Sequence, residues 1–210
     1  MNNSQAYNQW AEQYDSNNNK TRDLEAIALR SVLADRQFEH ILEIGCGTGK
    51  NSVWLKDRCT TLTGLDFSEE MLAKAKSKIP DAHVDFRWAD IRQPWAVPDG
   101  GFDLVTFSLV LEHIEDIEFI FAEVRRVLRP GGMVYLGEFH PFKQYLGSKA
   151  RFEMENGDIF VLECFNHHTS DFFAAANKQG LRCADIQEWT DNDDEHGGIP
   201  RVLTMVFVYD

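Results

Sequence analysis

Short apolar runs of strand length alternate with segments of helical period between residues 41 and 137. The strand-like runs lie within residues 40–44, 59–67, 83–90, 102–116 and 126–138. Because two neighbouring parallel strands must be joined by a crossover, which is usually a helix, this alternation predicts a parallel sheet built from right-handed βαβ units.

The helical spacing is clearest in segments 22–35 and 116–128. The first segment places its apolar face on Leu24, Ile27, Ala28 and Leu33. The second places it on Ile117, Ile120, Phe121, Val124 and Leu128. We expect the Pro-Gly-Gly sequence at residues 130–132 to end the second helix, because proline cannot continue a helix.

The pattern changes after residue 138, where a loop is expected to begin at His140. Residues 159–165, 181–189 and 202–209 have the composition of strands. Between the first two of these, we expect a helix that begins at a Thr169 or Ser170 cap and ends at Gly180. The acidic sequence DNDDEHGG at residues 191–198 is interpreted as a solvated turn rather than a metal site.

The first strand-like run ends in three alternating glycines, Gly45, Gly47 and Gly49, and a helix-like segment follows at residues 50–57. Glycines in such a turn let the backbone approach a ligand where a side chain would block it. The turn also offers backbone N–H groups near the start of a helix. In open α/β sheets this arrangement forms a nucleotide-type site at the carboxyl end of a strand.

The spacing of the turn separates three kinds of ligand site. A phosphate-binding P-loop would need an earlier glycine, where Ile44 stands, and Ser or Thr after Lys50, where Asn51 stands. The dinucleotide pattern GxGxxG would need its third glycine at Lys50, one residue later than Gly49. The pattern that remains is acid-x-Gly-x-Gly-x-Gly, with Glu43 as the acid.

This pattern resembles the first motif of the class I S-adenosylmethionine-dependent methyltransferases, and further matches follow in order over residues 39–138. The resemblance implies a Rossmann-like α/β fold with a seven-stranded, mostly parallel sheet and helices on both faces. Its last strand would run antiparallel, inserted between the fifth and sixth. It also implies one methyltransferase domain over residues 1–210, with N-terminal lid helices (1–36), a cofactor-binding half (37–138) and an acceptor side (139–210).

The resemblance assigns roles to residues after the second and third strands. Asp66 stands 23 residues after Glu43 and would accept hydrogen bonds from the ribose hydroxyls of the cofactor. Phe67 and Met71 would enclose the adenine, with Ser68 as the cap of the intervening helix. Asp90 would take the adenine amino group, and the backbone N–H of Ile91 a ring nitrogen. Each acid can also be interpreted as a group that simply precedes a helix.

The N-terminal segment carries an aromatic stripe of Tyr7, Trp10 and Tyr14. It either packs on the domain or, as in similar methyltransferases, folds over the cofactor as part of a lid. The expected cofactor-binding residues are Tyr14, Glu43, Gly45, Cys46, Gly47, Asp66, Phe67, Met71, Asp90, Ile91, Ser108 and His113.

Two histidines are candidate catalytic residues, His113 after the fourth strand and His140 after the fifth. Neutral imidazole can remove a proton from an acceptor near neutral pH. Each also has a structural interpretation, at a helix start or on the surface. Acceptor recognition is expected from the N-terminal helices and the aromatic-rich segment 140–168, and whether O, N, S or C is methylated stays open.

The charge of the chain restricts its partners. The formal net charge of −13 disfavours a nucleic acid, whose phosphates it would repel. The fourth strand also ends in Ser-Leu-Val-Leu at 108–111, without the Pro-Pro-Tyr signature of similar base-methylating enzymes. The expected partner is therefore a small-molecule acceptor, and the expected assembly is a monomer or a homodimer.

The sequence contains no apolar stretch of membrane-spanning length, and its N-terminus lacks the pattern of a signal peptide. We therefore expect a cytoplasmic protein without a membrane partner. The four cysteines show no CxxC spacing, so we expect reduced thiols and no metal site.

The leading functional hypothesis is methyl transfer from S-adenosylmethionine to a small molecule by in-line displacement, with S-adenosylhomocysteine as product. Two alternatives stay open. One is a non-catalytic S-adenosylmethionine-binding module, and the other is a nicotinamide-dependent oxidoreductase, which the position of Gly49 disfavours.

Overall fold

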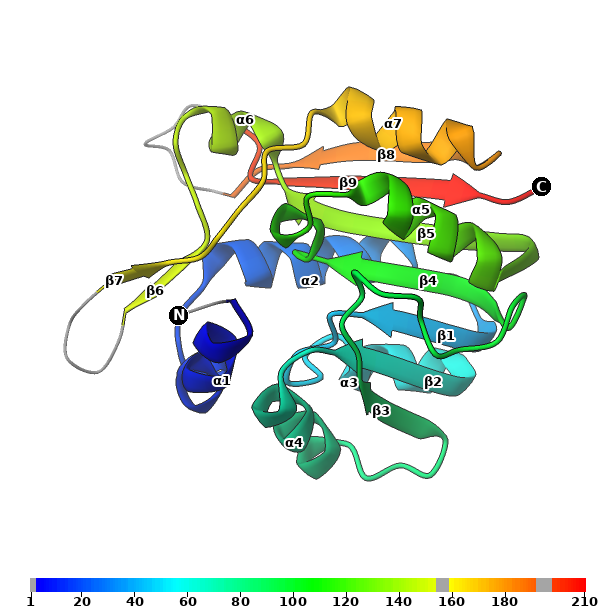
Figure 1. Cartoon of the computed structure of the whole chain (residues 1–210), viewed down its shortest axis with the longest axis horizontal. Coiled ribbons are helices and arrows are strands. Elements are labelled where there is room, and N and C mark those ends of the chain that lie inside the picture. The colour runs from blue at the N-terminus through cyan, green and yellow to red at the C-terminus, as the bar shows by residue number, and fades with distance from the viewer. Residues whose placement is uncertain (1–2, 154–158, 192–197) are drawn as a thin grey trace.

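The computed structural model describes residues 3–153, 159–191 and 198–210 of the chain. Its centre is a seven-stranded sheet with the strand order β3-β2-β1-β4-β5-β9-β8 (Figure 1). A separate antiparallel pair is formed by β6 (Arg151–Glu153) and β7 (Ile159–Val161). The strands of the large sheet are β1 (Phe38–Ile44), β2 (Cys59–Asp66), β3 (Val84–Trp88), β4 (Phe102–Ser108), β5 (Leu128–Phe139), β8 (Arg182–Trp189) and β9 (Val202–Val208).

The directions of the strands confirm the predicted Rossmann-like sheet. β1 pairs in parallel with β2 and β4, β3 pairs in parallel with β2, and β5 pairs in parallel with β4. β9 lies between β5 and β8 and runs antiparallel to both. The carboxyl ends of β1, β2 and β4 therefore meet at one edge of the sheet. Figure 1 shows α1 (Asn3–Tyr14) and the β6–β7 pair beyond this edge.

Helices cover both faces of the sheet. Successive residues Ile41 and Leu42 of β1 belong to different apolar clusters, because neighbouring side chains of a strand point to opposite faces. On the face of Ile41 pack α2 (Lys20–Val32) and α3 (Ser52–Leu55), and on the other pack α5 (Ile117–Val127) and α7 (Thr169–Lys178). The remaining helical elements are α4 (Glu69–Lys78), α6 (Pro141–Tyr145), and the 3-10 turns η1 (Lys56–Arg58) and η2 (Leu111–His113).

α5 shows how the sequence sets the bounds of a helix. The side chain of Asp116 caps its first turn by accepting a hydrogen bond from the backbone N–H of Phe119 at 3.0 Å. The whole predicted apolar stripe is buried. The helix ends at Val127, and the Pro-Gly-Gly sequence at 130–132 lies inside β5 rather than at the helix end.

The predicted apolar face of segment 22–35 is only partly right. Ala28 and Leu33 are fully buried, but Leu24 is half-buried and Ile27 is 56% exposed. The acidic Glu25 occupies the inner face in their place, with 2% of its surface exposed. A polar residue can take such a position only where it finds hydrogen-bond partners, and Glu25 has three, described below.

The segment after β5 differs from the expectation. Residues 141–145 form the helix α6 instead of a loop, and the side chain of His140 caps it by accepting a hydrogen bond from Phe142 N at 3.1 Å. β7 ends at Val161, so the strand is shorter than the predicted segment 159–165.

The helix α7 was predicted with a different cap. His168 is its N-cap residue rather than Thr169 or Ser170, and the carboxylate of Asp171 accepts a hydrogen bond from His168 N at 2.8 Å. Gly180, with φ of +71°, follows the end of this helix as expected. The predicted acidic turn at 191–198 lies mostly outside the described residues.

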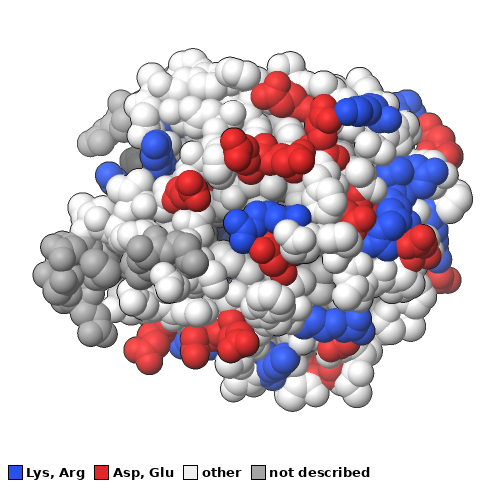
Figure 2. Space-filling model, in the orientation of Figure 1, with Lys and Arg blue, Asp and Glu red and all other residues white. Residues whose placement is uncertain are grey.

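The surface is mixed in charge. On the face drawn in Figure 2, acidic and basic side chains are interspersed. Among the described residues, no helix is long and apolar enough to cross a membrane.

Candidate active site

The backbone of the glycine turn after β1 borders an open space. Gly45 and Gly47 both have positive φ, +69° and +53°, which favours glycine. A Cβ atom on Gly45 would come within 2.4 Å of a methyl group of Val110, so packing excludes a side chain there. A Cβ atom on Gly47 would meet nothing within 4 Å, because Gly47 faces a cavity.

Asp66, at the end of β2, holds this turn from the neighbouring strand. Its Oδ2 accepts a hydrogen bond from Gly47 N at 2.8 Å, and its Oδ1 accepts one from Ser68 N at 2.9 Å. The side chain is 6% exposed, and burial raises the pKa of the carboxyl to about 6. Ser68 caps α4 as predicted, accepting from Met71 N. The acid therefore fixes the shape of the turn while its carboxylate lines the same cavity.

A cavity of about 380 Å³ opens beside the glycine turn, at the carboxyl ends of β1, β2 and β4, and we call it the turn cavity. It brings together most of the residues expected to bind the cofactor. Those that line it are Tyr14, Gly45, Gly47, Asp66, Phe67, Met71, Asp90, Ile91, Ser108 and His113.

Two of the expected residues lie behind the turn instead. The carboxyl group of Glu43 accepts a hydrogen bond from Ser52 Oγ at 2.5 Å and is 4% exposed, so it does not face the ligand side. Burial raises the pKa of Glu43 to about 8. The side chain of Cys46 packs among Leu72 and Phe86, away from the cavity.

Asp90 lines the turn cavity but already has a partner. Its two oxygens accept hydrogen bonds from Arg92 Nε and Nη2, both at 2.8 Å. This ion pair lowers the pKa of Asp90. An adenine amino group would therefore have to share the carboxylate with Arg92, which the sequence did not indicate.

His113 stands at the rim of the turn cavity in a fixed orientation. Its Nδ1 lies 3.0 Å from the carbonyl oxygen of Glu163, and its Nε2 lies 2.9 Å from the hydroxyl of Tyr7. A carbonyl oxygen can only accept, so in the tautomer that has its proton on Nδ1 the imidazole donates to Glu163 and accepts from Tyr7 through Nε2. His140 does not line the turn cavity or the second cavity described next, and its Nε2 lies 3.0 Å from Glu188 Oε1.

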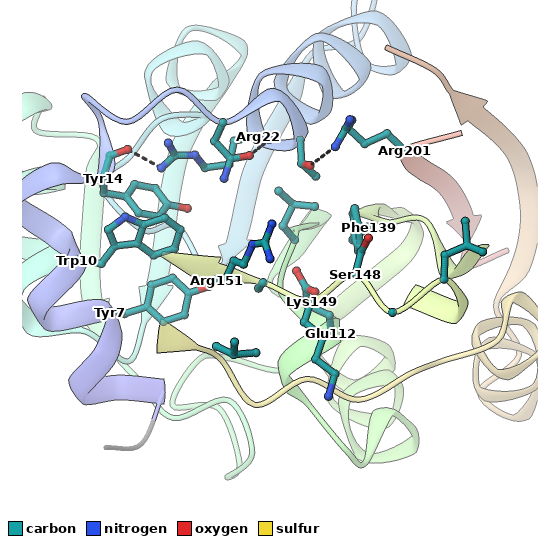
Figure 3. Close-up of a pocket in the computed structure, with 17 residues that line it drawn as sticks. Tyr7, Trp10, Tyr14, Arg22, Glu112, Phe139, Ser148, Lys149, Arg151 and Arg201 are labelled. Atoms are coloured by element: carbon teal, nitrogen blue, oxygen red, sulfur yellow. Dashed lines mark hydrogen bonds between the residues drawn. The ribbon is translucent and has the colours of Figure 1, made fainter. Parts of the chain in front are cut away.

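A second cavity of about 540 Å³ adjoins the first (Figure 3), and we call it the basic cavity. The two share Tyr7, Tyr14 and Leu109 as a common wall. Leu109 has φ of +58°, a conformation that costs a residue with a side chain about 1–2 kcal/mol and that recurs at functional sites.

The charged side chains divide between the two cavities. Among the described residues, the turn cavity is lined by four acids and one arginine: Asp66, Asp90, Glu115, Glu163 and Arg92. The basic cavity is lined by four cations and one acid: Arg22, Lys149, Arg151, Arg201 and Glu112. The two adjoining spaces thus favour ligand groups of opposite charge.

Comparison with known proteins agrees with this geometry. Residues 42–136 match the methyltransferase domain family. Just under half of the chain is therefore similar to that family.

Two curated relatives match parts of the chain. Malonyl-[acyl-carrier protein] O-methyltransferase of Salmonella typhimurium is 36% identical over 52% of this chain and 42% of its own length. Ubiquinone biosynthesis O-methyltransferase of Pseudomonas aeruginosa is 28% identical over 71% of this chain and 61% of its own length. The chain therefore spans about half the length of the curated relatives it matches.

The likeness to a solved structure extends over almost the whole chain. The N-methyltransferase NodS of Bradyrhizobium japonicum, solved in complex with S-adenosylhomocysteine, superposes with a TM-score of 0.73. The alignment covers 99% of this chain and 98% of NodS at 19% identity.

Glu25 is a buried residue behind the site that the sequence pattern did not reveal. Its carboxyl group accepts hydrogen bonds from Ser108 Oγ at 2.7 Å, Asn51 Nδ2 at 2.9 Å and Tyr135 Oη at 3.2 Å. Burial raises its pKa to about 7. It ties α2 to the ends of β4 and β5 directly behind Ser108. An acid on the inner face of an amphipathic helix was the signal that could have found it.

Proposed function

We propose that the protein binds S-adenosylmethionine in the turn cavity and transfers its methyl group to a small-molecule acceptor in the adjoining basic cavity. The observation that supports this most directly is the pairing of Gly47 and Asp66, which places backbone and a buried carboxylate at one open space.

The residues of the turn cavity fit this cofactor. Each oxygen of Asp66 accepts one hydrogen bond from backbone and has capacity for another, as the two hydroxyls of a ribose require. Phe67 and Met71 supply an apolar surface for a base. The acidic lining suits a ligand with a sulfonium and an ammonium group. When bound, S-adenosylmethionine supplies an electrophilic methyl group.

The N-terminal segment would exclude water from the site. Ser4 Oγ donates to the carbonyl oxygen of Phe67 at 3.3 Å. Beyond α1, Asp15 accepts hydrogen bonds from Thr48 Oγ1 at 2.6 Å and Lys78 Nζ at 2.7 Å. These contacts hold the segment across the turn cavity, where Tyr7 and Tyr14 form the wall that both ligands would share. Alignment of the reactants and exclusion of water can supply much of the catalysis.

For an acceptor that must lose a proton, we propose His113 as the base. Its Nε2 lies 2.9 Å from the hydroxyl of Tyr7, which borders both cavities, so that the acceptor's proton would pass to Tyr7 as the Tyr7 proton passes to the imidazole. His140 is proposed as a structural residue, because it caps α6 and lines neither cavity.

The basic cavity favours an enzyme over a non-catalytic binding module. A module that only binds the cofactor has no need of a second, adjoining cavity, and this one has room for a small molecule. The net charge of −13 supports a small acceptor rather than a nucleic acid.

The test is a calorimetric titration with S-adenosylhomocysteine, with NAD as the control ligand. We expect one-site binding of S-adenosylhomocysteine alone, weakened at least about tenfold in Asp66→Asn, because hydrogen bonds to a charged group are lost. The matched control is Asp35→Asn, at an exposed acid outside the site. Binding of NAD but not of S-adenosylhomocysteine, or unchanged affinity in Asp66→Asn, would contradict the proposal.

A further inference from the structure

We propose that the acceptor carries an anionic group, a carboxylate or a phosphoryl group, and that Arg22 and Arg151 of the basic cavity bind it. The inference rests on the proposed function in so far as the bound molecule is the methyl acceptor, whereas the anion site follows from the residues of the basic cavity alone.

Arg22 is a buried cation whose charge is not neutralised. It is 8% exposed, and its guanidinium donates to two neutral carbonyl oxygens, those of Tyr14 and Asn17. Its Nε has no hydrogen-bond partner, and within the described residues no carboxylate forms an ion pair with it. The guanidinium carbon lies 4.0 Å from the ring centroid of Tyr14, a wall of the cavity. A buried charge of this kind is costly unless a counter-charge arrives.

Arg151 and Lys149 bring further positive charge from a distant part of the sequence. Both are exposed, and neither forms an ion pair within the part of the chain that the structure describes. Figure 3 shows the guanidinium of Arg151 reaching into the cavity from the side opposite Arg22. Arg201 is different, because Asp191 already pairs with it.

The acid of the cavity does little to balance these cations. Glu112 is 8% exposed, and burial raises its pKa, which favours the neutral form. In a chain with a net charge of −13, a cavity lined by four cations and one such acid is a local exception. Guanidinium groups bind carboxylates and phosphates with two parallel hydrogen bonds, so the chemistry of the cavity matches these anions.

The rest of the lining indicates an apolar body on the same ligand. Tyr7, Trp10 and Tyr14 form one wall, and Phe139, Leu146 and Val161 contribute apolar surface elsewhere. The shared wall places this space beside the turn cavity, so an anion held by Arg22 would keep the ligand next to the methyl donor.

A purely structural role for Arg22 makes a different prediction. If Arg22 only tethers α2 to the end of α1, its replacement lowers the stability of the fold, and replacement of the exposed Arg151 changes neither stability nor anion binding. The two interpretations therefore separate at Arg151, whose replacement is not expected to disturb the fold.

The experiment is a calorimetric titration of the protein, with and without saturating S-adenosylhomocysteine, using benzoate, phenylphosphonate and inorganic phosphate as probes. Benzamide is the neutral probe with the shape of benzoate. The variants are Arg151→Gln and Arg22→Gln, checked for folding by thermal unfolding. The matched control is Arg30→Gln, an exposed arginine on the same helix as Arg22.

We expect benzoate or phenylphosphonate to bind at least about tenfold more tightly than benzamide, because charged hydrogen bonds are the stronger ones. Arg151→Gln should weaken this binding about tenfold, Arg22→Gln by at least as much, and Arg30→Gln not at all. Weaker anion binding in the folded Arg151→Gln variant supports the site. Benzamide binding as tight as that of benzoate, no binding of any anion, or unchanged binding in folded Arg151→Gln would overturn it.

The result is distinguishable from failure of the proposed function. Anion binding without any binding of S-adenosylhomocysteine would refute the cofactor and leave the anion site standing. Binding of S-adenosylhomocysteine without anion binding would refute the anion site alone.

Discussion

The two cavities of this protein are neighbours with opposite character. The turn cavity is acidic and is built from the ends of adjacent parallel strands, whereas the basic cavity is lined by α1, α2 and segments after β5. They share Tyr7, Tyr14 and Leu109. The difference between them means that two adjoining spaces of one site suit ligands of opposite charge, a cationic donor in one and an anionic acceptor in the other, as we propose.

We expect Gly47→Val to give the largest difference between ligand binding in the turn cavity and ligand binding in the basic cavity. A β-branched residue is strained at φ of +53°, and its side chain would enter the turn cavity. We expect the affinity for S-adenosylhomocysteine to fall by roughly a hundredfold while anion binding changes little, because this backbone conformation favours glycine and the added side chain would fill space that the ligand needs. Calorimetry with both ligands measures this, and equal loss of both would show that the cavities do not act separately.

The acids of the turn also predict how cofactor binding depends on pH. Burial raises the pKa of Asp66 to about 6, so the carboxylate takes up a proton as the pH falls through that value. The protonated form loses acceptor capacity for the ribose. We expect the affinity for S-adenosylhomocysteine to fall up to about tenfold per pH unit below pH 6. An affinity that is flat between pH 5 and pH 7 would show that cofactor binding does not depend on a proton taken up by Asp66 in this range.

Two buried acids, Glu43 and Glu138, predict how the free energy of unfolding depends on pH. Burial raises the pKa of Glu43 and of Glu138 to about 8, above the ordinary value of 4.5, so the folded state binds more protons than the unfolded state between these values. The free energy of unfolding must then decrease as the pH rises through this range.

Glu43→Gln removes one of these groups and should raise the free energy of unfolding at pH 8 by roughly 1–2 kcal/mol, with little change at pH 5. Urea unfolding at the two pH values, with the exposed Glu70→Gln as control, measures the difference. A variant that is destabilised equally at both values would show that Glu43 is ionised in the folded protein.

The smallest effect is expected at Arg92, the one Lys or Arg among the described residues that line the turn cavity. Arg92→Gln frees Asp90 from a surface ion pair whose contribution is small. We expect S-adenosylhomocysteine affinity to change by less than about threefold, because exposed pairs contribute little. A loss of binding comparable with that of Asp66→Asn would instead make Arg92 a direct cofactor contact.

The sheet and the turn cavity were predictable because their signals are local. The strand-like runs, the glycines and Asp66 follow one another in sequence, and the topology then brings the strand ends to one edge. The expected role of Glu43 was less accurate, because the sequence does not show that Ser52 binds its carboxyl group behind the turn.

The basic cavity could not be predicted in the same way. Arg22 and Arg151 are 129 residues apart, and neither belongs to a motif. The role of Glu25 could not be predicted for a similar reason, since its hydrogen-bond partners Asn51, Ser108 and Tyr135 come from three other segments. Leu109 adds a backbone conformation that residue type does not indicate.

The central claim is transfer of a methyl group to an anionic small molecule. The most direct measurement uses S-adenosylmethionine labelled in its methyl group and a cell extract that has first been separated on an anion exchanger. We expect label to enter small molecules of the retained fraction with the wild-type protein, and much less with Asp66→Asn. Transfer only into the unretained fraction would contradict the anionic acceptor, and transfer into neither would contradict the methyltransferase activity itself.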